Sequence, residues 1–400
     1  MGILVEIADG ASAAWRLIEP KARVRLILRQ FFENSGLTKG DFRPSIGAIN
    51  QTDYGYRVII HLFPGKWIGD VWEKLPELGA AFNAEAAVQE DGSGWLILDL
   101  YTRGLPGGRE GFPYRMDLAA RVREYDFGFP VGVCRDGFYV LDMARDEYCG
   151  ILAGGITGSG KTYWLRQGLV AICTNYTPEE AVLYLVDMKD EGLELRILEG
   201  CPHVAAFGTD QAGSMAVLQA VTAELRRRSG LFAAAGVSDI AGYRATGHQL
   251  AHMALMIDEF ADLPDDGKDM VIRFGRVGRY AGLHPIVCTQ RPDRDTLPPA
   301  LKANLPVSMA FRTKNELNSR MIIDGPQAAH INKADKGRAF ILADRARWVQ
   351  VVSLPRPAAE KLLAPCKQRP MPAVEVKTWE PISELMSLQE LNVVREDDSW

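Results

Sequence analysis

Four hundred residues, 47% of them apolar and 24% charged, are enough for two or three packed domains and exclude a disordered, collagen-like or minimal disulfide-stabilised chain. The 46 Lys and Arg residues face 51 Asp and Glu residues, so the net charge of −5 gives no sign of a nucleic-acid partner, and any DNA contact has to be local. The six cysteines are widely spaced and lack the C-x-x-C and Cys/His spacings of zinc sites, which predicts reduced thiols in a cytosolic protein without disulfides or a structural metal.

A membrane or secretory segment is not visible in the sequence. No stretch of about 18 residues is free of charged side chains. Glu6 and Asp9 come too early for the apolar core of a signal peptide. We therefore expect a cytoplasmic chain without a transmembrane segment of its own.

Residues 1–115 predict a small α+β domain, because helical periodicity alternates there with period-2 strand patterns. Residues 104–113 then hold six glycines and prolines, a composition typical of a linker. The expected elements are helices at about Ala13–Phe32 and Trp67–Phe82 and strands at Tyr56–Leu62 and Gly94–Leu100.

The first of these helices has two possible roles. It carries four basic residues beside a long apolar stripe, as does a helix that rests on the cytoplasmic surface of a membrane. A helix that packs on the domain's own sheet, with its basic side chains in solvent or on DNA, has the same pattern. Pro20 interrupts the stripe and the nearby strands need a cover, which favours packing. The basic residues are Lys21, Arg23, Arg25 and Arg29.

Residues 116–354 predict an α/β domain, most clearly after Phe127. Short apolar runs of strand type are separated there by helical stretches, which is the pattern of a mainly parallel sheet with crossover helices. The strand-like runs are Ala181–Val186, Met253–Ile257, Pro285–Cys288, Pro306–Phe311 and Ala339–Leu342.

Residues 355–400 predict a proline-rich tail rather than a third domain. Six prolines between Pro355 and Pro381 are followed by a short amphipathic segment around Ile382–Leu391 and an acidic end. No internal repeat or low-complexity tract accompanies them.

The strongest functional signal lies between Gly155 and Thr162. The sequence GITGSGKT fits G-x-x-x-x-G-K-[ST], with an apolar run before it and a helical pattern over Tyr163–Ile172 after it, which is the strand–loop–helix context that this motif needs. Glycines let successive backbone N–H groups surround a β-phosphate, and the helix adds the positive end of its dipole. Lys161 would reach the β- and γ-phosphates, and Thr162 would bind Mg²⁺. The expected ATP-binding residues are Gly155, Thr157, Gly158, Ser159, Gly160, Lys161, Thr162 and Tyr163.

A second signal is the strand-like run Met253–Ile257, which ends in Asp258 and Glu259. Period-2 geometry points the two carboxylates in different directions. Asp258 can then hold Mg²⁺ while Glu259 activates the attacking water, a division of roles typical of hydrolysing motors. A strand end of this kind is usually only structural, but beside a P-loop it predicts a catalytic pair of carboxylates.

Gln290 and one of several arginines complete the predicted catalytic set. Gln290 follows the next strand-like run and can hydrogen-bond the γ-phosphate or the attacking water. Arg276, Arg279 and Arg320 are candidates for a charge that stabilises the transition state. On spacing alone, each of the three is more often a solvated helix residue.

In this order, the segments resemble the FtsK/SpoIIIE family of hexameric double-stranded DNA translocases. The resemblance runs from about Phe129 to Leu354 and includes Arg320–Asp324. One of its stretches contains a D-x-K element with Lys189, to which the residue pattern assigns no role. The four stretches that carry it are GGITGSGKTYW, LVDMKDEGLELRILEGCPHVA, MALMIDEFADL and GRVGRYAGLHPIVCTQRPDRDTLPPALKANLPVSMAFR.

The resemblance implies a RecA-like P-loop NTPase core, a ring of six subunits, ATP at each subunit interface, and double-stranded DNA in the central channel. It also implies that Arg279 is the arginine finger donated by the neighbouring subunit, which places it ahead of Arg276 and Arg320. ATP and Mg²⁺ are the expected cofactors.

Loops that follow the Gln290 strand would face the channel. The expected DNA contacts are therefore Arg291, Arg294 and Lys302, which would bind phosphates without regard to sequence. Arg226–Arg228, at the end of a helical pattern, is a second basic cluster with a weaker claim to DNA.

Chromosome-segregating members of the family carry N-terminal membrane spans and a C-terminal winged helix, and we expect neither here. The chain instead resembles compact FtsK/SpoIIIE-type proteins of conjugative and integrative elements. The expected partners are duplex DNA, further copies of the chain, and a recruiting protein at the inner face of the membrane. A protein-export ATPase of the same superfamily, as in type VII secretion, is the alternative. A third reading, an ATP-binding switch without motor activity, would need neither Glu259 nor Arg279.

Overall fold

The structure is a computed structural model that describes residues 18–38, 43–52, 55–62, 68–82, 84–90, 95–101, 105, 112–135, 137–292 and 296–368. All the described residues belong to one compact unit. The predicted amphipathic segment around Ile382–Leu391 lies outside the described residues.

A small antiparallel sheet and two helices occupy residues 20–101. The sheet has the order β1–β2–β4–β3, and the sequence patterns predicted β2, β4 and both helices but missed β1 and β3, which form its two edges. Edge strands are harder to predict because only part of their surface is buried. The elements are α3 (Pro20–Asn34), β1 (Ser45–Thr52), β2 (Gly55–His61), α4 (Ile68–Phe82), β3 (Glu85–Glu90) and β4 (Trp95–Tyr101).

Helix α3 packs on this sheet, as the packing alternative predicted. Val24, Leu28 and Phe32 are buried in the same apolar core as the inner residues of β2 and β4. The Arg25 guanidinium donates to the carbonyls of Ile46 and Gly47 at 2.9 and 3.0 Å, which ties the helix to β1. Within the described part of the helix, most of the apolar stripe therefore packs on the domain itself, although Leu26 is 43% exposed. Pro20 begins the helix rather than interrupting it, because its fixed φ suits the first helical position.

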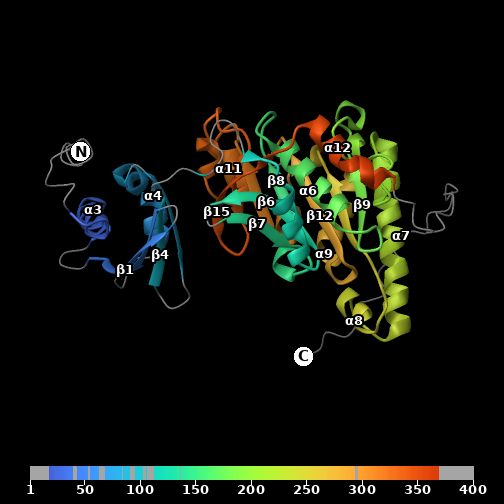
Figure 1. The fold of residues 1–400 in the computed structure, drawn as a ribbon, viewed down its shortest axis with the longest axis horizontal. Coiled ribbons are helices and arrows are strands. Elements are labelled where there is room, and N and C mark those ends of the chain that lie inside the picture. Colours follow the sequence, from blue (N-terminus) through green and yellow to red (C-terminus); the bar gives the residue numbers. More distant parts are fainter. Residues whose placement is uncertain are drawn as a thin grey trace. The chain divides into compact units, whose positions relative to one another are not determined.

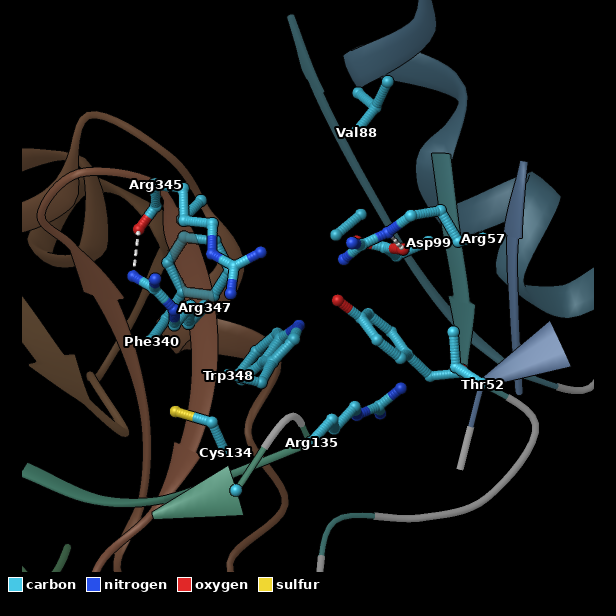
Figure 2. Close-up of a pocket in the computed structure, with 14 residues that line it drawn as sticks. Thr52, Arg57, Val88, Asp99, Cys134, Arg135, Phe340, Arg345, Arg347 and Trp348 are labelled. Carbon is cyan, nitrogen blue, oxygen red and sulfur yellow. Dashed lines mark hydrogen bonds and ion pairs between the residues drawn. The ribbon is translucent and has the colours of Figure 1, made fainter. Parts of the chain in front are cut away.

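The face of the sheet opposite its core is polar at its centre. Figure 2 shows the guanidinium of Arg57, from β2, beside the carboxylate of Asp99, from β4. Two nearly parallel hydrogen bonds of 2.7 and 3.0 Å join Arg57 Nε and Nη2 to the two carboxylate oxygens. This bidentate pairing across neighbouring strands helps to fix their register.

The larger sheet has ten strands in the order β10–β9–β11–β12–β8–β13–β14–β15–β6–β7 (Figure 1). The first six are parallel neighbours and the remainder pair antiparallel, so the expected parallel sheet forms the half that holds the P-loop. The run Ala339–Leu342 belongs to antiparallel β14, and its assignment to the parallel set was wrong, because an apolar run does not encode strand direction. The strands are β6 (Gly128–Cys134), β7 (Gly137–Asp142), β8 (Ile151–Gly154), β9 (Ala181–Val186), β10 (Val204–Gly208), β11 (His252–Ile257), β12 (Leu283–Thr289), β13 (Val307–Phe311), β14 (Arg338–Leu342) and β15 (Ala346–Gln350).

Helices cover both faces of the parallel half and bury it. Side chains of α6 and α12 share one apolar core with the sheet, and side chains of α7, α9 and α10 share the other. Successive strand residues alternate between the two cores, as in Met253, Ala254 and Leu255 of β11. The arrangement is a three-layer α/β sandwich. The helices are α6 (Lys161–Asn175), α7 (Gln211–Ala235), α8 (Ile240–Ala245), α9 (Asp265–Val277), α10 (Pro299–Asn304), α11 (Glu316–Ile323) and α12 (Arg356–Lys367).

Helix α12 corrects the predicted start of the tail at residue 355. Ala359, Leu363 and Cys366 are buried against α6, so this helix belongs to the core of the α/β domain. Pro357 is compatible with the helix because it lies in the first turn, where no backbone hydrogen bond is lost, whereas Pro365 lies inside the helix, two residues before its end. No described helix has both the length and the apolar character needed to cross a bilayer.

Candidate active site

The loop between β8 and α6 needs glycine at several positions. Gly155, Gly158 and Gly160 have φ angles of 158°, 74° and 111°. A Cβ atom at Gly155 would lie 2.6 Å from the Cβ of Phe311, and one at Gly160 would lie 2.5 Å from the Cα of Gly337. Both the backbone angles and the close neighbours therefore exclude larger residues. The carbonyls of Thr289 and Arg312, which follow or end neighbouring strands, accept from the N–H groups of Gly155 and Ile156 and hold the loop in place.

Three polar atoms of this region are buried without a hydrogen-bond partner among the described residues. They are Ser159 Oγ, Lys161 Nζ and Asp258 Oδ1, on residues that are only 4, 5 and 3% exposed. A buried polar group without a partner costs about 1–3 kcal/mol. Phosphate oxygens would satisfy the hydroxyl and the ammonium, and a hydrated divalent cation would satisfy the carboxylate. The donor set thus fits a nucleotide phosphate with Mg²⁺.

Thr162 and Tyr163 occupy the first turn of α6, beside the loop. Thr162 is half-buried, and Tyr163 is 39% exposed. The guanidinium carbon of Arg166 lies 5.3 Å from the centre of the Tyr163 ring, and Arg166 also pairs with Glu194 at 2.5 Å. The structure thus places every predicted P-loop residue on one continuous segment at the carboxyl end of β8.

The two predicted carboxylates follow β11, which is buried on both faces. Burial raises the pKa of Asp258, although the positive charges of Lys161 and Lys189 oppose this shift. Burial also raises the pKa of Glu259, again against the charge of Lys161. The structure therefore brings both carboxylates close enough to the P-loop lysine for its charge to act on them. Lys189 belongs to the same site, which the sequence pattern did not reveal.

Gln290 meets both the P-loop and Glu259. Its side-chain oxygen accepts from the Thr157 hydroxyl at 2.5 Å, and its backbone N–H donates to Glu259 Oε2 at 2.8 Å. The hydroxyl of Thr289 donates to Glu259 Oε1 at 2.7 Å. Strand β12 lies between the P-loop strand β8 and the carboxylate strand β11, so its carboxyl end connects the two halves of the site. Sequence analysis singled out Gln290 but missed Thr289, which has no signal beyond its place at a strand end.

Asp187 is a further buried carboxylate that the sequence analysis did not assign. It follows β9, accepts from the backbone N–H groups of Lys189 and Leu195 at 3.2 and 3.1 Å, and so shapes the segment that carries Lys189. Burial, followed by the nearby charge of Asp258, raises its pKa to about 6. Its position at the end of an apolar run was the available signal.

This geometry can be compared with known proteins. The FtsK/SpoIIIE family model matches residues 120–255, which contain the P-loop and end three residues before Asp258. The chain carries an FtsK/SpoIIIE domain. That domain supplies β8, α6, β9 and most of β11, and it contains Ser159 and Lys161 but not Asp258.

Curated relatives of the FtsK/SpoIIIE domain are DNA translocases. The DNA translocase FtsK of Bacillus cereus is 34% identical over 212 residues, which are 49% of this chain and 26% of that protein. The DNA translocase SftA of Bacillus subtilis is 35% identical over 196 residues, which are 46% of this chain and 20% of that protein. The DNA translocase SpoIIIE of the same organism is 32% identical over 190 residues, which are 44% of this chain and 24% of that protein. The chain spans about a quarter of the length of these relatives.

Two solved structures share the fold of the FtsK/SpoIIIE domain. The pCW3 conjugation coupling protein TcpA, in a monomer form with ATPγS, matches with a TM-score of 0.57 and 19% identity over 84% of this chain and 98% of that one. The cytoplasmic domain of the Thermomonospora curvata type VII secretion ATPase EccC matches with a TM-score of 0.52 and 23% identity over 58% of this chain and 30% of that one. The predicted RecA-like P-loop fold is confirmed.

Arg279 lies near the amino ends of the parallel strands, whereas the P-loop of its own FtsK/SpoIIIE domain lies at their carboxyl ends. It comes just before β12, whereas Gln290 comes just after that strand, and seven strand residues span roughly 20 Å. Its exposed guanidinium pairs with Asp146 at 3.0 Å. Arg276 and Arg320 are also exposed, and Arg320 lies 3.7 Å from Glu316. Arg279 thus does not lie at the nucleotide site of its own chain.

The basic residues predicted to contact DNA lie in different environments. Arg291 is exposed at the start of the segment after β12, and Arg294 lies outside the described residues. Lys302, on α10, pairs with Asp324 at 2.7 Å, so its charge is already partly balanced. Arg228 is 2% exposed and donates to the Ala281 carbonyl at 2.6 Å, so its proposed DNA contact was wrong: a basic residue in the middle of α7 had been taken for a helix end.

Proposed function

We propose that the chain is an ATP-driven translocase of double-stranded DNA that works as a ring of six copies. The observation that carries this proposal is the set of buried, unpaired polar atoms on Ser159, Lys161 and Asp258, with Glu259 next to them. A site built for triphosphate and a divalent cation explains why the fold tolerates them.

ATP hydrolysis in this proposal uses residues that already lie together. Lys161 would bind oxygens of the β- and γ-phosphates, and Thr162 and Asp258 would hold Mg²⁺. Bound Mg²⁺ would supply a positive charge that neutralises the phosphates. Glu259 takes a proton from the water that attacks the γ-phosphorus, the bond to the β–γ bridging oxygen breaks, and ADP and phosphate leave. Its raised pKa makes the ionised carboxylate a better base.

Ring formation is proposed from the place of Arg279. This arginine and the P-loop lie at opposite ends of the same parallel strands. A single copy therefore cannot use Arg279 for its own nucleotide, whereas the nucleotide site of a neighbouring copy can receive it. An arginine supplied in this way raises turnover by about 10³–10⁵. The exposed pair with Asp146 is weak, at about 0–1 kcal/mol, and leaves the guanidinium available to a neighbour.

Duplex DNA is proposed as the substrate because the curated relatives are DNA translocases. Arg291, two residues after β12, and Arg294 beyond it are the proposed phosphate contacts, and Lys302 is retained with them although it must leave Asp324 to reach DNA. The fold likeness to a conjugation coupling protein supports a role in DNA transfer by a mobile element, with a membrane protein recruiting the ring from the cytoplasm.

Polypeptide export is the second candidate, because the fold also matches a type VII secretion ATPase. The two functions share ATP chemistry and differ in what stimulates it. They can be separated by measuring ATP turnover of the full chain with linear duplex DNA, single-stranded DNA or an unfolded polypeptide. Strong stimulation by duplex alone supports the translocase. Stimulation by polypeptide alone, or by nothing, would overturn it.

A further inference from the structure

Thr289 joins three parts of the site. Its side chain is fully buried at the end of β12. Its hydroxyl donates to Glu259 Oε1 at 2.7 Å and accepts from the backbone N–H of Arg291 at 3.1 Å, while its carbonyl accepts from the N–H of Gly155 at 3.1 Å. A buried hydroxyl is costly unless it is hydrogen-bonded, and this one uses both its donor and an acceptor position.

Packing alone does not require a threonine at this position. Valine has nearly the same shape and is favoured in buried strands. The residues of β12 that precede Thr289, from Leu283 to Cys288, include no other hydroxyl side chain. The hydroxyl is therefore explained by its two hydrogen bonds, one to Glu259 and one to Arg291.

The same end of β12 holds both oxygens of the Glu259 carboxylate. Oε1 accepts from Thr289, and Oε2 accepts from the backbone N–H of Gln290 at 2.8 Å. These two hydrogen bonds hold the carboxylate toward β12 and fix its orientation. Two neighbouring residues of one segment thus determine where the proposed base points.

The segment that begins at Arg291 connects this arrangement to the protein surface. Arg291 is exposed, and the next residue, Pro292, accepts at its carbonyl from Asn318 Nδ2 of α11 at 2.9 Å. The Arg291 carbonyl also accepts from the Thr296 hydroxyl. A ligand that moves the Arg291 backbone therefore changes a hydrogen bond to Thr289 directly, and Thr289 is one hydrogen bond away from Glu259.

We propose that Thr289 is a positioning residue that links the segment starting at Arg291 to Glu259, so that duplex DNA bound to this segment releases the carboxylate for proton transfer. The inference rests on the proposed function and adds a route by which DNA regulates hydrolysis. It assigns Thr289 no contact with ATP.

Thr289→Val tests the link, and Thr289→Ser is its matched control because it keeps the hydroxyl. ATP turnover of each variant of the 400-residue chain is measured at saturating ATP with and without linear duplex. In Thr289→Val we expect DNA-free turnover to rise and the ratio of turnover with duplex to turnover without it to fall about tenfold, equivalent to about 1.4 kcal/mol. Thr289→Ser should keep both the wild-type DNA-free turnover and the wild-type ratio.

Equal loss of turnover with and without DNA in Thr289→Val would mean that the residue is only structural and would overturn the inference. An unchanged ratio in that variant overturns it as well, and leaves the proposed function intact if duplex stimulates the wild-type chain. A wild-type chain that duplex does not stimulate overturns both.

A second pair of variants applies if Thr289→Val does not fold. Arg291→Ala and Arg291→Pro both remove the guanidinium, but only the proline variant also removes the N–H that donates to Thr289. We expect DNA-free turnover to be higher in Arg291→Pro than in Arg291→Ala. Equal DNA-free turnover in the two would contradict the link.

Discussion

The replacement Glu259→Gln examines the proposed base without disturbing its surroundings. Gln has the same shape, and its amide oxygen can accept from the Gln290 N–H, now 2.8 Å from Oε2. Its amide nitrogen then faces the Thr289 hydroxyl, which can rotate to accept. The variant therefore keeps both contacts but cannot take a proton.

The expected loss follows from the role of a general base. Proton transfer by a positioned base contributes about 10²–10⁴ to the rate, so turnover should fall by that factor, equivalent to about 2.7–5.4 kcal/mol in the activation free energy. ATP affinity should be nearly unchanged, because Ser159, Lys161 and Asp258 remain. Steady-state phosphate release with duplex DNA measures turnover, and equilibrium binding of a fluorescent ATP analogue measures affinity.

Stability provides a further check on this variant. Burial raises the folded-state pKa of Glu259 above its unfolded value, so the stability that this carboxyl contributes is present below the unfolded pKa and is lost as pH rises through the folded pKa. At neutral pH the charged group therefore opposes folding, and Glu259→Gln should unfold at no lower temperature than the wild type.

A matched control is Asp262→Asn, which makes the same change of charge at an exposed position three residues further along the chain. This variant should keep turnover within a few-fold of the wild type. Retention of more than about a tenth of wild-type turnover in Glu259→Gln would remove Glu259 from the mechanism, because the loss would then be smaller than a general base contributes.

Three other outcomes are expected. Lys161→Ala should lower ATP affinity by about 100-fold or more in the same binding assay, because the buried site loses its cation; tight binding would refute the P-loop assignment. Arg279→Ala should lower turnover by about 10³ or more, and mixing it with Lys161→Ala subunits should restore part of it, whereas no activity at any mixing ratio would count against an arginine acting between subunits. Burial raises the pKa of Asp187 to about 6, so the stability that this carboxyl contributes is lost as pH rises from about 4 to 6. In urea unfolding, the free energy of unfolding of the wild type should fall by up to about 3 kcal/mol over that range relative to Asp187→Asn. Parallel plots of unfolding free energy against pH for the two proteins would refute the burial argument.

The nucleotide site was largely predictable from the sequence because its chemistry is local. The glycines of the P-loop are required by backbone angles and close neighbours, as at Gly155 and Gly160, and both requirements leave a fixed spacing in the chain. Asp258, Glu259 and Gln290 follow buried strands, and parallel pairing brings the carboxyl ends of these strands together.

Other features depended on contacts between distant segments. The apolar run of β14 gave no sign that the strand is antiparallel, and the prolines near α12 concealed a helix that packs on α6. Arg228 appeared to be a basic surface residue until its contact with the Ala281 carbonyl was known. Thr289 looked like an ordinary strand residue, since its role depends on carboxylate and loop groups that only the fold brings together.

The central claim is that ATP hydrolysis at this site drives movement along a double helix. Displacement of a third strand from a linear triplex by the full-length chain tests this most directly, because a protein that only binds DNA leaves that strand in place. The account predicts displacement that requires ATP and is abolished in Glu259→Gln. Rapid ATP hydrolysis with no displacement, or displacement that persists without ATP, would contradict it.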